Sequence, residues 1–148
     1  MVFLALGSNL GDRAENLRLA REKLAAYLEV ELASSPAVAT AALGFEGPEF
    51  LNQVVAFDKE IAPLALLDTC QRIEQELGRK AHPARYNAAG ERIYEDRVID
   101  IDILTMGAVK LATDRLRLPH PQCWERPYIA QLVAMMPLCI QRQYTVLQ

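Results

Sequence analysis

The sequence has 148 residues, of which 51% are hydrophobic and 24% are charged. This composition is typical of one globular domain, and it excludes a mainly disordered chain, a collagen-like chain and a coiled coil. The 16 basic and 19 acidic residues give a net charge of −3, which argues against general nucleic-acid binding because such binding requires clustered positive charge. We therefore expect a single domain over residues 1–148.

The cysteines and the apolar runs predict the cellular compartment of the chain. Cys70, Cys123 and Cys139 have no metal-ligand spacing, and an odd number of cysteines without a secretory signal favours reduced thiols in a cytosol. No apolar run approaches the roughly 18 residues that a membrane-spanning helix needs. We expect a cytoplasmic monomer that binds neither nucleic acid nor a membrane.

Apolar periodicity and turn residues predict the secondary structure in chain order. An apolar run opens the chain, and Asp12 with Glu15 resembles a capping box before a helical pattern. The expected elements are a strand over 2–6, a helix over about 12–27, a strand over 28–32, extended structure over 37–40, a loop over 41–49, a strand over 50–57, a helix from Pro63 to Gly78, a loop over 79–96, a strand over 98–104, a short strand around 115–118 and a helix from Pro127.

The order strand, helix, strand, strand, helix, strand predicts an α+β fold of ferredoxin-like type. In this βαββαβ arrangement the helices pack on one face of the sheet, and a short strand or helix is added at the C-terminus. Ferredoxin-like folds carry many functions, so the function has to be inferred from particular residues.

The sharpest chemical feature is an acidic pair in the strand over 98–104. Residues two apart in a strand point the same way, so Asp100 and Asp102 share one face while Ile99, Ile101 and Ile103 pack on the other. The two Cα atoms lie roughly 6.5 Å apart. Magnesium suits such a pair because it binds carboxylates and keeps positions open for phosphate, and two ions can clamp a transferring phosphoryl group. The alternative is an ordinary solvated strand face.

The loop before this strand is basic and aperiodic. Residues 79–97 contain Arg79, Lys80, Arg85, Arg92 and Arg97 against three acidic residues. Arginine suits phosphate because its planar group binds two oxygens at once, so an anionic ligand is indicated beside the acidic pair. A solvated loop is the alternative, although a long loop without periodicity is often a functional lid.

Three further features are compatible with nucleotide or heterocycle binding. Gln71 and Glu74 share a helix face and have the groups to bond a base or sugar. Phe50 and Asn52 share a strand face, where the ring can stack on a flat heterocycle and the amide can hydrogen-bond to the edge of the same heterocycle. His120 lies between two prolines and has the chemistry to contact phosphate. For each feature an ordinary surface or core role is the simpler interpretation of the residues alone.

Several common sites are absent from the sequence. It has neither GxGxxG nor GxxxxGK[ST], so neither a dinucleotide-binding motif nor a P-loop is supported. Two histidines make a zinc site a poor interpretation.

Five separated segments resemble the 6-hydroxymethyl-7,8-dihydropterin pyrophosphokinase family. They are Ala5-Leu6-Gly7-Ser8-Asn9-Leu10, Phe50-Leu51-Asn52, Gln71-Arg72-Ile73-Glu74 with Gly78-Arg79, Arg97 through Asp100-Ile101-Asp102-Ile103, and Leu118-Pro119-His120 with Arg126. The resemblance runs from Leu4 to about Pro137, and the order and spacing of the segments make it specific.

The resemblance implies transfer of pyrophosphate from ATP to the hydroxymethyl oxygen of the pterin, with two magnesium ions on Asp100 and Asp102. It implies catalytic roles for Arg79 and Arg97 beside these aspartates. The ATP-binding residues implied are Gln71, Glu74, Arg79, Arg97, Ile103, His120 and Arg126. The pterin-binding residues implied are Gly7, Thr40, Leu43, Phe50, Asn52 and Tyr128, with the two aromatic rings on either side of the pterin.

The resemblance also makes residues 79–96 a loop that closes over the substrates and excludes water. One alternative is a binding module that keeps the pterin pocket without catalysis, which the intact Asp100, Asp102 and Arg97 argue against. Another is a different magnesium-dependent nucleotidyl or phosphoryl transferase. The pair of Phe50 and Asn52 argues against that alternative because it suits a flat heterocyclic acceptor.

Overall fold

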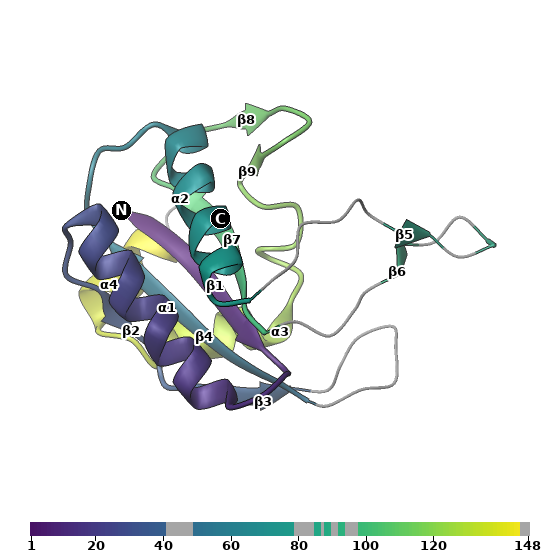
Figure 1. The fold of residues 1–148 in the computed structure, drawn as a ribbon. Coiled ribbons are helices and arrows are strands. Elements are labelled where there is room, and N and C mark those ends of the chain that lie inside the picture. The colour runs from purple at the N-terminus through teal and green to yellow at the C-terminus, as the bar shows by residue number, and fades with distance from the viewer. Residues whose placement is uncertain (41–48, 79–84, 87, 90–91, 94–97, 146–148) are drawn as a thin grey trace.

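The computed structural model describes residues 1–40, 49–78, 85–86, 88–89, 92–93 and 98–145 (Figure 1). The two loops expected over 41–49 and 79–96 lie mostly outside the described residues. Leu43, Arg79 and Arg97 also lie outside them.

The centre of the fold is an antiparallel sheet of five strands. The strands are β1 (Val2–Ser8), β2 (Ala33–Ser34), β3 (Val38–Thr40), β4 (Phe50–Phe57) and β7 (Asp100–Met106). Their order is β2-β4-β1-β7, and β3 also pairs with β4. Every residue of β1 is buried, as the opening apolar run predicts for a central strand covered on both faces.

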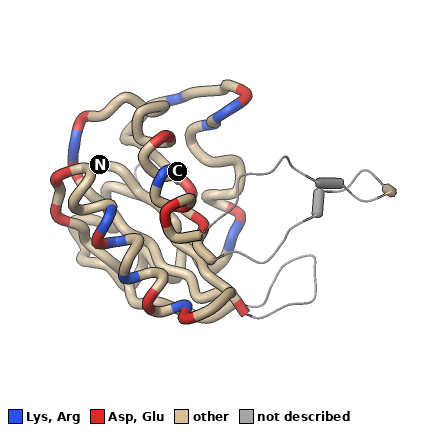
Figure 2. Tube along the Cα trace, viewed as in Figure 1, with Lys and Arg blue, Asp and Glu red and all other residues tan. Residues whose placement is uncertain are grey.

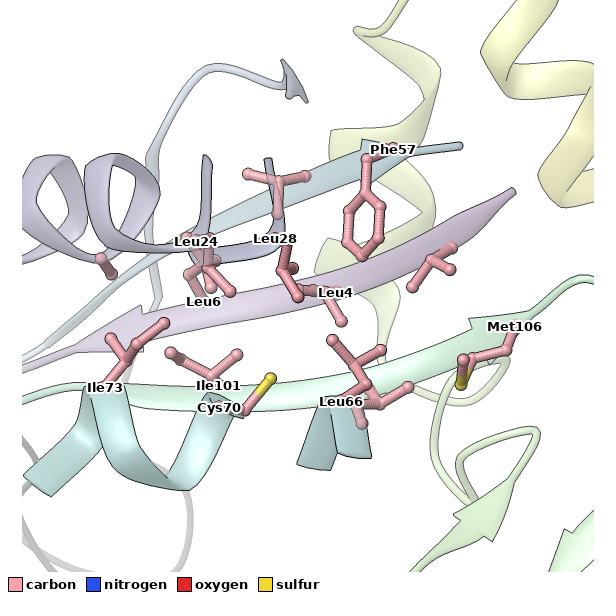
Figure 3. Packing of buried hydrophobic residues seen from close by; sticks show 14 of the residues in the cluster. Leu4, Leu6, Leu24, Leu28, Phe57, Leu66, Cys70, Ile73, Ile101 and Met106 are labelled. Carbon is pink, nitrogen blue, oxygen red and sulfur yellow. The ribbon is translucent and has the colours of Figure 1, made fainter. Parts of the chain in front are cut away.

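Two helices cover one face of this sheet. They are α1 (Arg13–Leu28) and α2 (Pro63–Glu76). The capping-box prediction is confirmed, because Asp12 Oδ1 accepts a bond of 3.1 Å from the Glu15 N–H at the start of α1. Figure 3 shows apolar side chains of both helices meeting those of β1, β4 and β7 in one core. This arrangement confirms the predicted ferredoxin-like packing.

The C-terminal addition covers part of the opposite face. It consists of α3 (Pro127–Ala134) and α4 (Leu138–Thr145), which lie behind the sheet in Figure 1. Ile129 and Leu132 of α3 pack with Phe3 and Val54 of the sheet in a second core. The Tyr144 ring of α4 lies 4.9 Å from the Phe3 ring, centre to centre. The predicted helix at Pro127 is confirmed, and α4 completes the addition.

The predicted strand over 28–32 is wrong. Helix α1 continues to Leu28, and Glu29 ends it in a left-handed conformation with φ of 54° while its N–H bonds to the Ala25 carbonyl. Val30 and Leu32 are only packed against the core, and pairing begins at β2. The alternation of apolar residues therefore marks partial burial of a segment that has no strand partner.

The remaining elements are short. They are the hairpin of β5 (Arg85–Tyr86) with β6 (Arg92–Ile93) and the hairpin of β8 (Leu111–Ala112) with β9 (Arg117–Leu118). The second hairpin confirms the short strand expected around 115–118. Within the described part of the chain, no helix has the length and apolarity needed to cross a membrane.

Glu76 joins the two helices on their outer side, where acidic and basic residues alternate (Figure 2). Its carboxylate accepts bonds from Lys23 Nζ at 2.8 Å, from the Tyr27 hydroxyl at 2.6 Å and from Arg72 Nε at 2.9 Å. These bonds, the one from Lys23 first, lower the pKa of Glu76 from its ordinary 4.5 to about 2.

This lowered pKa predicts a pH-dependent contribution to stability. A carboxyl with a lowered pKa in the folded state stabilises the fold above its ordinary pKa, and the contribution is lost as the pH falls through about 2. Replacing Glu76 with Gln should lower the melting temperature at pH 7, and the difference from the wild type should shrink between pH 4.5 and 2. Circular dichroism melts measure this, with exposed Glu60→Gln as control. A difference that stays constant over this range would contradict the prediction.

Candidate active site

The strand register brings three of the predicted site residues together on one face of the sheet. Gly7 of β1 pairs with Asp100 of β7 on one side and with Asn52 of β4 on the other. Residues directly opposite one another in a sheet point to the same face, so the three form a row across three strands. With strands about 4.8 Å apart, the backbones at Asp100 and Asn52 are separated by about 10 Å.

The second acidic residue lies on the same face. Asp102 pairs with Ala5, which pairs in turn with Val54. Ile99, Ile101 and Ile103 are buried in the opposite core with α1 and α2, as the period of two predicts. The predicted division of this strand into an acidic face and an apolar face is therefore confirmed.

Gly7 makes room for the Asn52 side chain. A Cβ atom on Gly7 would lie 3.1 Å from Asn52 Oδ1 and 3.5 Å from Phe50 Cδ1, so the missing side chain lets both groups lie over β1. Asn52 is only 7% exposed, and its Nδ2 donates to Thr40 Oγ1 at 2.5 Å. The structure thus brings together Gly7, Thr40, Phe50 and Asn52.

Arg126 joins this region to the acidic pair. It lies at the start of α3, and its Nη1 donates to Asp102 Oδ2 at 3.2 Å and to the Tyr128 hydroxyl at 3.1 Å. Burial raises the pKa of Tyr128, which keeps its hydroxyl protonated, and Arg126 opposes part of that rise. The guanidinium therefore lies between an acidic side chain and an aromatic side chain predicted to bind different substrates.

The acidic pair has the donor chemistry that magnesium requires. Asp100 and Asp102 are half-buried carboxylates on one face, and Asp102 already lies against a cation in Arg126. In the part of the chain that the structure describes, no group of three or more His, Cys, Asp or Glu residues is arranged to hold a metal. Magnesium nevertheless fits, because it is usually held by one or two carboxylates together with water and substrate phosphates.

Glu74 supports the strand that carries the acidic pair. It is 6% exposed, so the alternative of an ordinary exposed helix residue is wrong. Its Oε2 accepts a bond of 3.0 Å from the Ile101 N–H, which lies between Asp100 and Asp102 in the chain. Because β7 is the outermost strand in the order β2-β4-β1-β7, this bond satisfies a backbone donor that has no neighbouring strand.

A cavity of about 270 Å³ lies along the outer edge of β7. Its lining includes the 101–103 backbone segment, Thr113, Arg115, Arg117 and His120. Along a strand the backbone groups of alternate residues face the same edge, so the N–H and C=O of Ile103 face the edge to which the Ile101 N–H points. Asp102 also lines the cavity, which therefore reaches the acidic pair.

Two of the predicted ATP-binding residues, His120 and Gln71, lie at this cavity or bond to a residue that lines it. The His120 N–H donates to the Leu104 carbonyl at 2.8 Å, and its Nδ1 accepts from the Gln122 N–H at 3.1 Å, so the proton is on Nε2. Burial, with the nearby Arg126, lowers the pKa of His120, which keeps the ring neutral at pH 7. Gln71 is exposed on α2 and accepts from Arg115 Nη2 at 3.4 Å.

Arg115 and Arg117 are two cavity residues that the sequence pattern did not single out. The pattern predicts only a short strand around 115–118, whereas the structure places both side chains on the cavity. The available signal was two arginines at alternating positions in the segment that follows the acidic strand.

Known proteins of one family are similar to this chain over most of its length. Residues 3–137 match the model of the family described as 7,8-dihydro-6-hydroxymethylpterin-pyrophosphokinase (HPPK). A 2-amino-4-hydroxy-6-hydroxymethyldihydropteridine pyrophosphokinase of Porphyromonas gingivalis is 42% identical over 131 residues, which cover 87% of this chain and 85% of that protein. The protein of the same name from Bacillus subtilis is 32% identical over 95% of this chain and 79% of its own length.

A longer plant protein contains a similar segment. The mitochondrial folate synthesis bifunctional protein of Pisum sativum is 36% identical over 86% of this chain, although the match covers 23% of that protein. The resemblance noted from five short segments is thus confirmed along most of the sequence. The chain belongs to the 7,8-dihydro-6-hydroxymethylpterin-pyrophosphokinase family.

Proposed function

We propose that the chain carries out the reaction of its family on the sheet face shared by Asp100, Gly7 and Asn52. As a member of the family it is a pyrophosphokinase of folate biosynthesis, which transfers pyrophosphate from ATP to 6-hydroxymethyl-7,8-dihydropterin. The products are AMP and the pterin diphosphate. The observation that carries the proposed location is the register, in which a carboxylate and a buried amide lie in one row about 10 Å apart.

The cavity along β7 is our proposed site for the nucleotide. The Ile103 N–H and C=O offer a donor and an acceptor to the edge of the adenine, and the Nε2–H of neutral His120 offers a further donor. Arg115 and Arg117 line the same cavity and offer guanidinium groups to phosphate or ribose oxygens, although Arg115 Nη2 also donates to Asp68 Oδ1 at 2.6 Å. Because Asp102 also lines the cavity, a triphosphate leaving it runs toward the acidic pair.

Asp100 and Asp102 would hold the magnesium, with two ions as the prediction. When bound there, magnesium offsets phosphate charge and orients the phosphates. Arg126 places a positive charge beside Asp102. We propose that Gln71 and Glu74 belong to the ATP site, where Glu74 also holds the backbone of β7 through its bond to the Ile101 N–H. The catalytic roles of Arg79 and Arg97 stay predictions that rest on the sequence.

The proposed pterin site is the group around Asn52. The bond to Thr40 Oγ1 turns the Asn52 amide so that its Oδ1 lies over Gly7, on the side of β7. That oxygen is an acceptor for the donors of the pterin edge, while Phe50 and Tyr128 offer aromatic faces. Leu43 remains a predicted contact outside the described residues.

The chemistry needs little from the protein beyond this arrangement. The nucleophile is an alcohol, and phosphoryl-type transfer depends mainly on positioning and on stabilisation of charge. The described site accordingly offers carboxylates, guanidinium groups and a neutral histidine. That residues 79–96 close over the substrates, and that the protein acts as a monomer, stay predictions.

Product analysis with ATP, magnesium and hydroxymethyl-dihydropterin tests the proposal. The wild type should release AMP, and D100A or D102A should lower kcat at least about 100-fold because charge stabilisation is lost. Their melting temperatures should stay close to that of the wild type, because the isoleucine face of β7 is unchanged. Exposed Asp58→Ala, just after β4, is the matched control. Release of ADP would point to an ordinary kinase, and full activity of D100A or D102A would remove the proposed metal site.

Separate binding measurements test the division of the site. N52A should weaken binding of the pterin about tenfold or more, because a hydrogen bond in a buried pocket is lost, and should leave ATP binding within about twofold. G7A should act in the same direction, because it places a methyl group 3.1 Å from Asn52 Oδ1. Isothermal titration calorimetry with each ligand alone measures both. Equal weakening of ATP and pterin binding would show that the division is wrong.

A further inference from the structure

Gln122, in the turn before α3, makes an unusual set of bonds to Arg126. Its side-chain Oε1 accepts from Arg126 Nε at 2.9 Å and from Nη2 at 2.5 Å, and its backbone carbonyl accepts from the Arg126 N–H at 3.2 Å. Two donors on one edge of the guanidinium thus meet a single acceptor, which fixes both the direction and the plane of the group.

The bonds to Gln122 direct the opposite end of the guanidinium, Nη1, toward the proposed active site. With Nε and Nη2 on Gln122, it is Nη1 that reaches Asp102 Oδ2 at 3.2 Å and the Tyr128 hydroxyl at 3.1 Å. An unrestrained arginine can turn its Nε and Nη2 edge onto a carboxylate and bind both oxygens. Gln122 occupies that edge in the structure, and it is Nη1 that reaches one oxygen of Asp102.

Gln122 also orients a second residue of the proposed nucleotide site. Its backbone N–H donates to His120 Nδ1 at 3.1 Å, which fixes the ring and keeps the Nε2–H as donor. The turn itself is tied by the Cys123 N–H, which donates to the His120 carbonyl at 3.0 Å. One residue therefore lies at the centre of the turn that carries both His120 and Arg126.

We propose that Gln122 is a positioning residue, which holds the Arg126 guanidinium at a fixed point between Asp102 and Tyr128. The consequence is that Arg126 stays beside both the proposed phosphate region and the aromatic region. This inference rests on the proposed function for the site around Asp102 and Tyr128. Gln122 itself need not touch either substrate.

Two substitutions of Gln122 separate hydrogen bonding from packing. Q122A removes the side chain, whereas Q122M keeps its length and lacks the amide oxygen. Both should lower kcat/KM for ATP about tenfold, the range expected when a bond to a charged group is lost. E125A, an exposed residue of the same turn, should leave kcat/KM unchanged. Wild-type values in Q122M would show that the side chain only fills space and would overturn the proposal.

A double-mutant cycle tests whether Gln122 acts through Arg126. In an R126A background, Q122A should change kcat/KM less than twofold, because the group that it positions is already gone. Full additivity of the two losses would overturn the proposal. Melting temperatures of all variants show whether each one folds.

Nuclear magnetic resonance gives a measurement that does not depend on the reaction. The Arg126 Nε–H signal, assigned by its loss in R126A, should exchange slowly in the wild type and in E125A. It should broaden or exchange rapidly in Q122A and Q122M, and a slow signal in Q122M would overturn the proposal. If this pattern is found while the wild type releases no AMP, the proposed function fails and the positioning of Arg126 stands.

Discussion

The antiparallel register of β4, β1 and β7 is the constraint on which the site depends. It fixes Asn52, Gly7 and Asp100 in one row, and a shift of one residue in either pairing would turn a whole set of side chains to the other face. A shift of β7 against β1 would bury the acidic pair among the leucines of α1 and α2. The apolar side chains of that core therefore hold the proposed site in place.

The two faces of the sheet differ in how completely they are covered. Helices α1 and α2 pack on one face, whereas α3 and α4 pack on the other beside Phe3 and Val54. The row at Asn52 and Asp100 lies at the end of β1 where Gly7 replaces a side chain, so the backbone itself forms the floor of the site. Glu74 bonds the outer edge of β7 at Ile101, and His120 bonds the Leu104 carbonyl next to a register shift between β1 and β7, where the alternation of backbone groups is interrupted. The cavity lies along the same edge.

Local patterns were enough to predict much of this structure. The period of two identified the face shared by Asp100 and Asp102, and capping and proline signals located three of the helices. The same reasoning failed over 28–32, because alternation records burial and carries no information about pairing. It also treated Glu74 as an exposed residue, since its partner is a backbone N–H that lies 27 residues away in the chain. Cross-strand register depends on tertiary structure, and the contact of Gln122 with Arg126 depends on the conformation of an irregular turn, for which apolar periodicity gives no signal.

The position of Arg126 shows how the two halves of the site are connected. The row from Asn52 to Asp100 passes through Gly7, which has no side chain to carry an interaction between them. The guanidinium contacts the Asp102 carboxylate and the Tyr128 hydroxyl through the same nitrogen, so movement at either residue changes the geometry at the other. A positive charge that is to balance phosphate at the proposed site must not be neutralised by the group that holds it. An arginine held along its other edge by a neutral amide meets this requirement, because the amide adds no charge that would compete with the carboxylate.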